Sequence, residues 1–132
     1  MLGLTRKGDY AIRGLLYLAG QPEGSISLIS DIAKSVLVPQ TFLAKIFQSL
    51  GKSGLVNSAR GTGGGFTLAR PADQITLLDI VEAVEGKIIP NKCVMSDDKC
   101  SFKKTCNVHP VWIKMQNSIY EILGGATLKS LL

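Results

Sequence analysis

Apolar residues recur every three or four positions along most of the chain, a period that predicts a mainly helical protein. The first pattern predicts a helix over about residues 6–20, which begins after Thr5 and ends before Pro22. A second, shorter helix is expected at about 28–36, with the Ser27 hydroxyl as its N-terminal cap. The chain is therefore expected to begin with two amphipathic helices.

A third helix is expected after Val38, with Pro39 at its first position, where a missing N–H costs no hydrogen bond. Its predicted buried stripe consists of Leu43, Ile46, Phe47 and Leu50. The side chains on its other faces are short or polar and can bond to base edges and phosphates; they are Gln40, Thr41, Ala44, Lys45 and Gln48. Two helices joined by so brief a turn form a helix-turn-helix pattern.

A short β-hairpin is predicted to follow the third helix. Residues 55–59 and 66–68 are the expected strands, and the glycine-rich run 60–65 is the expected tip. Glycines let such a tip approach a sugar–phosphate backbone closely, and Arg60 adds a positive charge. A nucleotide-phosphate loop is the rival interpretation, but no Gly-Lys-Ser/Thr follows and the run leads into a strand. A hairpin in this place is the wing of a winged-helix module.

Two further helices are expected in the C-terminal half. Thr76 and Asp79 have the spacing of a capping box at the start of a helix that Gly86 ends. A long pattern with heptad spacing surrounds and follows Pro110, carried by Val108, Trp112, Met115, Ile119 and Ile122. Such a stripe suits packing against a partner helix, and a stripe that faces the chain's own core is the alternative. Because the N-terminal module is small, we expect a homodimer.

The net charge of +5 lies entirely in the N-terminal half. Residues 1–70 hold eight basic and three acidic side chains, whereas residues 71–132 hold seven of each. A basic half beside a neutral half indicates a module that binds a polyanion, joined to a part with another role. A basic surface that serves only solubility is the alternative that charge alone leaves open.

All three cysteines and the one histidine lie within seventeen positions, as Cys93-x6-Cys100-x5-Cys106-x2-His109. The loop expected at 87–108 is too polar to bury itself, so a bound metal centre would supply its order. Thiolates and imidazole suit zinc or an iron–sulfur cluster, and the wide gaps favour a cluster over a zinc knuckle. Unrelated thiols, or one disulfide and a spare thiol, are the alternative.

Composition argues against several classes of protein. No apolar run reaches the roughly 20 residues of a membrane span, and the charged start of the chain is not that of a signal peptide. We therefore expect a cytoplasmic protein without membrane contact, in which thiols stay reduced and serve ligation or redox chemistry. The chain has no catalytic nucleophile arrangement and no cofactor motif, so neither an enzyme nor an electron carrier is expected.

Several stretches resemble the IscR/NsrR family of winged-helix regulators. They are residues 4–11, Phe42–Phe47, Gly54-Leu55-Val56, residues 60–66, and the cysteine–histidine loop with Trp112 after it. The resemblance covers nearly the whole chain. It implies a bacterial homodimer, usually a repressor, that binds double-stranded DNA and holds an iron–sulfur cluster through three cysteines. Members of the family report iron–sulfur status, redox state or nitric oxide to a pseudo-palindromic operator.

The resemblance implies two candidates for the fourth cluster ligand. In cluster-assembly regulators it is a histidine after the third cysteine, here His109, and the cluster is 2Fe–2S. In nitric-oxide sensors it is an acidic residue near the start of the first helix, here Asp9 from the other subunit, and the cluster is 4Fe–4S. A first-turn carboxylate favoured by the helix dipole is the rival role for Asp9, and a capping histidine for His109. Ala44 stands where the cluster-assembly regulators have a glutamate, so the choice of DNA sequence should differ.

Together these patterns predict a mainly α protein with a small β-hairpin wing. A winged helix-turn-helix DNA-binding module is expected over 1–75, and a connecting helix, a cluster loop and a long C-terminal dimerisation helix over 76–132. The candidate ligands of an iron–sulfur cluster are Cys93, Cys100, Cys106, His109 and Asp9. The candidate DNA contacts are Gln40, Thr41, Lys45, Gln48, Arg60, Gly61, Thr62 and Gly63. We expect a repressor whose DNA affinity is gated by the cluster; a thiol- or zinc-based redox regulator without a cluster is the alternative.

Overall fold

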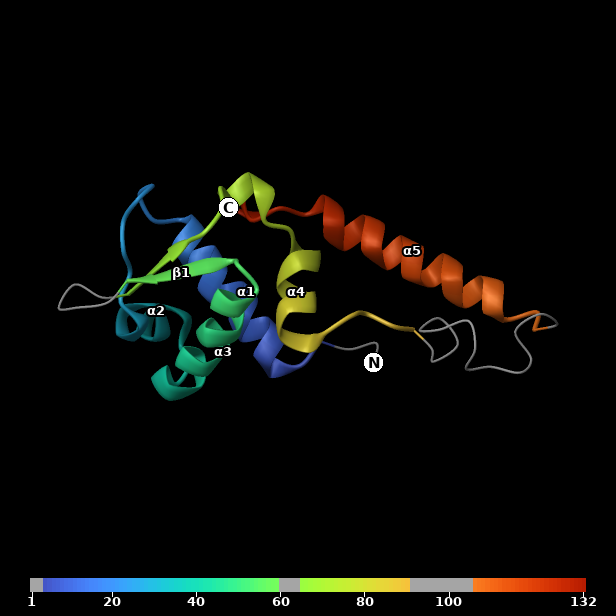
Figure 1. Cartoon of the computed structure of the whole chain (residues 1–132), viewed down its shortest axis with the longest axis horizontal. Coiled ribbons are helices and arrows are strands. Elements are labelled where there is room, and N and C mark those ends of the chain that lie inside the picture. Colours follow the sequence, from blue (N-terminus) through green and yellow to red (C-terminus); the bar gives the residue numbers. More distant parts are fainter. Residues whose placement is uncertain (1–3, 60–64, 91–105) are drawn as a thin grey trace.

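The structure, a computed structural model, describes residues 4–59, 65–90 and 106–132. In chain order its elements are α1 (Arg6–Ala19), α2 (Ile29–Val36), α3 (Gln40–Lys52), β1 (Val56–Ala59), β2 (Gly65–Leu68), η1 (Ala72–Gln74), α4 (Leu77–Glu85), α5 (His109–Gly125) and η3 (Lys129–Leu131). Helices α1 to α4 and the hairpin form one group, from which α5 extends away (Figure 1). No helix in the described ranges is long and apolar enough to cross a membrane. The predicted order of helices and strands is confirmed.

The core forms where α1, α3 and α4 meet beneath the hairpin. All four predicted stripe residues of α3 are buried: Leu43, Ile46, Phe47 and Leu50. The ring of Phe47 also packs edge-to-face on Phe66 of β2, with the ring centroids 5.0 Å apart. Helix α3 is thereby held on two sides, by α1 and by the hairpin.

Strand β2 of the hairpin is fixed, near its tip end, to the segment that leads into α2. Strands β1 and β2 are antiparallel, and Ala59 pairs with Gly65 next to the tip. The N–H of Ser27 donates to the carbonyl of Phe66 at 3.0 Å, and the N–H of Phe66 donates to the carbonyl of Ser27 at 2.8 Å. Gly65 lies so close to the Ser27 carbonyl that a Cβ would have no room there. This bridge places the wing beside the helix-turn-helix.

The starts of α2 and α3 differ from the prediction by one residue. Ser27 does not cap α2, because its backbone pairs with Phe66; the cap position is Leu28, whose side chain makes no capping bond. Pro39 precedes the first residue of α3 instead of occupying it. Its carbonyl still accepts from the N–H of Leu43 at 3.0 Å, so it begins the hydrogen-bond ladder of the helix.

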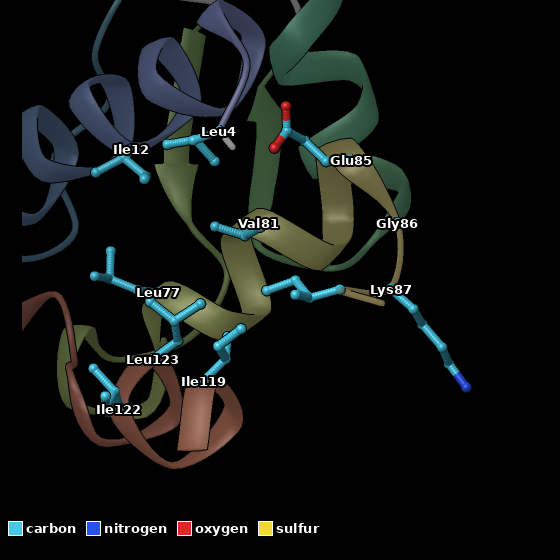
Figure 2. Close-up of a pocket in the computed structure, with 11 residues that line it drawn as sticks. Leu4, Ile12, Leu77, Val81, Glu85, Gly86, Lys87, Ile119, Ile122 and Leu123 are labelled. Atoms are coloured by element: carbon cyan, nitrogen blue, oxygen red, sulfur yellow. The ribbon is translucent and has the colours of Figure 1, made fainter. Parts of the chain in front are cut away.

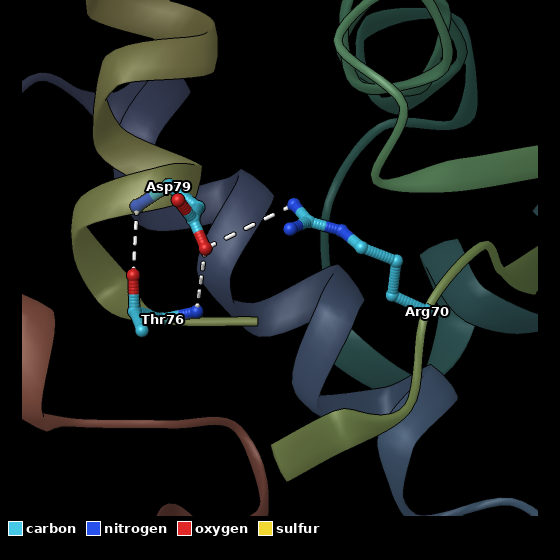
Figure 3. Close-up of polar contacts among 3 residues, drawn as sticks. All are labelled: Arg70, Thr76 and Asp79. Carbon is cyan, nitrogen blue, oxygen red and sulfur yellow. Dashed lines mark hydrogen bonds and ion pairs between the residues drawn. The ribbon is translucent and has the colours of Figure 1, made fainter. Parts of the chain in front are cut away.

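The capping box predicted for α4 is confirmed (Figure 3). The N–H of Asp79 donates to the Thr76 hydroxyl at 3.1 Å, and the N–H of Thr76 donates to the Asp79 carboxylate at 3.0 Å. The guanidinium of Arg70 lies 3.8 Å from the same carboxylate. Gly86 ends the helix with a φ of 80°, a left-handed value that favours glycine.

The end of the chain returns to the core after α5. The N–H of Leu77 donates to the carbonyl of Ala126 at 2.9 Å, and the N–H of Leu128 donates to the carbonyl of Ile75 at 2.9 Å. The side chain of Leu128 is fully buried. Helix α5 is therefore anchored at its C-terminal end, whereas none of its own residues is buried.

We expect Leu128→Ala to lower the free energy of unfolding by about 2–4 kcal/mol, because it leaves a cavity in the core. Urea denaturation of the two proteins measures the difference. Leu131→Ala is the matched control: that leucine is 45% exposed in the same segment, and its truncation should change stability by less than about 0.5 kcal/mol. Equal losses in both variants would contradict the place given to Leu128 in the core.

Candidate nucleic-acid interface and ligand loop

The polar face of α3 is exposed, as the sequence predicts. Its exposed side chains are Gln40, Thr41, Lys45 and Gln48. The opposite face is buried in the core, so the rotation of α3 about its own axis is fixed. The four side chains therefore face solvent together, and they can reach one surface of a duplex without any rearrangement of the helix.

The turn between α2 and α3 has a defined geometry. Helix α2 ends at Val36 and is capped by Leu37, whose backbone is left-handed with φ 59° and ψ 47°. The carbonyl of Ala33 accepts from the N–H of Leu37 and, at 3.0 Å, from the N–H of Val38. Val38 is buried, so the chain enters α3 from a fixed point. The angle between the two helices of the motif is set by these bonds.

The tip of the hairpin lies outside the described residues, and with it Arg60, Gly61, Thr62 and Gly63. The described strands fix where the tip begins and ends, at the pair Ala59 and Gly65. A two-stranded hairpin is thus confirmed in the place of a wing, whereas contacts between its tip and DNA stay a prediction.

Three of the five candidate ligands lie within the described residues, whereas Cys93 and Cys100 lie outside them. Cys106 has a half-buried free thiol, and His109 is the first residue of α5. Asp9 lies in the first turn of α1. In the described parts of the chain no three Cys, His, Asp or Glu side chains come together as a metal site. A single chain therefore does not bring Asp9 together with Cys106 and His109.

Asp9 forms an ion pair with Arg13, one turn further along α1, at 3.1 Å. Both side chains are about half exposed, so the pair contributes little to stability, under about 1 kcal/mol. The carboxylate also lies where the helix dipole favours negative charge. Asp9 can exchange this ion pair for another partner at small cost.

A contact between α4 and α1 was not predicted. The carboxylate of Glu85 accepts hydrogen bonds from the N–H of Thr5, at 2.9 Å, and from the Thr5 hydroxyl. Thr5 does precede the first helical residue of α1, but its side chain bonds to Glu85 and not to the helix. Glu85 is the last residue of α4, directly before the loop expected at 87–108, which we call the ligand loop. The contact therefore joins the start of the ligand loop to the first turn of α1, which carries Asp9.

An apolar groove of about 420 Å³ lies between α1, α4 and α5. Ile12 of α1, Leu77 and Val81 of α4, and Ile119 and Ile122 of α5 line it (Figure 2). Ile122 is 71% exposed, and Trp112, Met115 and Ile119 are only half-buried. The heptad stripe of α5 is therefore not covered by the chain's own core.

Residues 4–132 match the family model described as Rrf2, iron-dependent transcriptional regulator. The chain is 36% identical over 129 residues to the protein aau3 of Rhizobium meliloti strain 1021, covering 97% of this chain and 83% of that protein. Its structure is similar to CymR, the global cysteine regulator of B. subtilis, with a TM-score of 0.79, 29% identity, and 99% and 96% of the two chains covered. It is also similar to IscR of T. potens, with a TM-score of 0.75, 29% identity, and 98% and 85% covered.

We expect Lys45→Ala to weaken the binding of duplex DNA about threefold to tenfold at low salt, because one contact to a phosphate or a guanine is lost. Affinities measured at several salt concentrations test the phosphate contact, whose loss should reduce the slope of log K against log salt by about 0.9. Lys52→Ala is the control on the same helix, about two turns away at its last residue. Equal effects of the two changes would contradict a reading face at the N-terminal half of α3.

Proposed function

The chain belongs to the Rrf2 family of transcriptional regulators, and we propose that it is a homodimeric repressor whose affinity for DNA is set by an iron–sulfur cluster. The matched family and its named relatives are regulators of transcription and not enzymes. The observation that carries the finer proposal is the place of the cysteine loop, which joins α4 to α5. A change in that loop can therefore act on α4, which packs against the DNA-binding module, and on α5.

DNA would be read by the surface that α3 and the hairpin share. Helix α3 enters the major groove with Gln40, Thr41, Lys45 and Gln48, and the tip at 60–63 follows the backbone or the minor groove. Two copies would read a pseudo-palindrome whose half-sites are about one helical turn apart. Ala44, a short side chain on this helix, leaves room for base pairs that a glutamate there would reject.

We assign DNA reading to residues 1–75 and sensing with dimer formation to residues 76–132. The two parts differ in function but are not separate folding units, because Ile75, Ile80 and Leu128 share a core with α1, α2 and α3. Packed side chains at close density move together, so a shift of α4 reaches α3 through this core.

The dimer contact is proposed to consist of the heptad stripe of α5 and the apolar groove beside it. The stripe leaves Ile122 exposed, and the groove continues this surface over Val81 and Ile12. A helix of a second copy, packed along α5, would cover both and remove their apolar surface from water.

Cys93, Cys100 and Cys106 would hold the cluster, with His109 or the partner subunit's Asp9 as the fourth ligand. Three thiols with an imidazole or a carboxylate are a donor set that fits iron–sulfur chemistry. When bound, the cluster would supply an iron centre that responds to redox state and nitric oxide. His109 begins α5 and Asp9 lies in the first turn of α1, so each ligand would tie the loop to a helix.

The contact between Glu85 and Thr5 lies where the loop meets the module. A loop held by its ligands keeps the end of α4 against α1, and a released loop allows this end to shift. A tenfold change in DNA affinity requires only about 1.4 kcal/mol of difference between the two arrangements. An intramolecular hydrogen bond contributes about 0.5–1.5 kcal/mol, and the exposed contact between Glu85 and Thr5 can supply part of this difference.

A regulator that works through thiol oxidation, without a cluster, is the second candidate. The similarity to CymR, whose Staphylococcus aureus form is also solved in an oxidized state, favours it, as does the free, half-buried thiol of Cys106. Colour and iron content separate the two candidates, because thiol oxidation needs neither.

Protein purified without oxygen is expected to contain iron and sulfide and to absorb visible light. We expect Cys106→Ala to abolish this absorption, since a thiolate ligand is lost. Of the two variants Asp9→Ala and His109→Ala, one should lose the cluster and the other keep it, which identifies the fourth ligand. Iron and sulfide analysis with a visible spectrum provides the measurement. Colourless, iron-free wild type prepared in this way would refute the cluster and leave the thiol-based regulator.

Ile122→Glu is expected to convert the dimer into a monomer at micromolar concentration, because a carboxylate would be buried in the proposed contact. Sedimentation or light scattering measures the mass. Asn117→Glu introduces the same charge on the opposite, exposed side of α5 and should leave the mass unchanged. A wild type that is monomeric, or a dimer indifferent to Ile122→Glu, would argue against this contact.

A further inference from the structure

Leu37, in the turn between α2 and α3, is unfavourable by two criteria. It is the one non-glycine residue with a positive φ in the described parts of the chain. It is also 85% exposed, more than any other large apolar side chain described. A leucine in this conformation meets steric conflict between its Cβ and the backbone, and its exposed side chain gains little from packing.

The turn itself does not require leucine. The carbonyl of Ala33 accepts bonds from the N–H groups of Leu37 and Val38, an arrangement that ends a helix with a left-handed residue. Glycine is the residue that such a helix end usually carries, because it adopts this conformation without strain. The fold would therefore be more stable with glycine at position 37, so packing within the chain does not account for the leucine.

The residues and helices around Leu37 indicate which surface of the molecule it belongs to. Leu37 comes three residues before Gln40, where the exposed polar face of α3 begins. The nearest charged side chain along the chain is the exposed Lys34 in the last turn of α2. Helix α5, proposed as the dimer contact, leaves the module on the side away from α2 (Figure 1). The leucine thus borders the proposed DNA surface and not the proposed dimer surface.

We infer that Leu37 recognises thymine, by packing on its C5 methyl group in the major groove beside the bases that α3 reads. The inference rests on the proposed DNA-binding function. Base edges in the major groove offer donors and acceptors and a single apolar group, which is the thymine methyl. An apolar side chain at the border of a polar reading face complements that group and no other. Contact removes both apolar surfaces from water, which offsets the strain in the turn.

The test uses duplexes that the wild type selects from a random-sequence pool. Each is made with thymine or with uracil, which lacks only the methyl group, at one position at a time in both half-sites. Wild type is expected to bind one of these uracil duplexes on the order of tenfold more weakly. Leu37→Gly should bind the thymine duplex about as weakly as wild type binds the uracil one, and should lose nothing further with uracil.

Two more variants and a melting curve separate recognition from folding. Leu37→Met keeps an apolar side chain of similar reach and should keep the preference for thymine, whereas Leu37→Asn, which tolerates the left-handed backbone, should lose it. Leu37→Gly should melt about 3 °C higher than wild type because the strain is relieved. If Leu37→Gly binds DNA more weakly but melts at a higher temperature, misfolding cannot explain the loss of affinity.

Three results would overturn the inference. Leu37→Gly could bind thymine duplexes as tightly as wild type, or lose affinity equally for thymine and uracil duplexes, or change the mass of the protein instead of its DNA binding. In each case sequence selection by the wild type still supports the proposed function. A wild type that selects no sequence would contradict the proposed function itself, and the inference with it.

Discussion

The packing of α3 against α1 is the contact on which the rest of the molecule depends. Burial of Leu43, Ile46 and Phe47 fixes the rotation of α3, and this alone decides which side chains face a duplex. The same core takes in Ile80 of α4 and Leu128 from the end of the chain. The reading face, α4 and the end of the chain are thereby built on one set of packed side chains, so a shift of one of them is passed to the others.

Features that depend on local spacing could be predicted from the sequence, and those that depend on distant partners could not. The stripe of α3 and the capping box of α4 repeat within three or four residues, so periodicity and pair spacing reveal them. The bond from Thr5 to Glu85 spans 80 positions, and the bridge from Ser27 to Phe66 spans 39, so no local pattern announces them. The sequence predicts Ser27 as a helix cap, because its backbone pairing with Phe66 leaves no local pattern in the sequence.

The candidate sites divide in the same way. The polar face of α3 follows from the helical period, and the cysteine loop follows from its composition and spacing. The fourth ligand does not follow from the sequence. In the described residues Asp9 is not brought together with Cys106 and His109, so Asp9 would have to come from a second copy, whereas His109 follows Cys106 in the same chain. Leu37 gave no signal either: the sequence places it in the turn between two predicted helices, and only its backbone conformation and exposure set it apart.

The central claim is that the loop between α4 and α5 controls DNA affinity through the cluster it holds. The direct measurement is the affinity for a selected operator, by gel shift without oxygen at one salt concentration, of the protein with its cluster and after its removal. The account predicts dissociation constants at least about tenfold apart, a difference of about 1.4 kcal/mol. Equal dissociation constants would contradict gating by the cluster, while tight binding by both forms would leave the DNA-binding module as described.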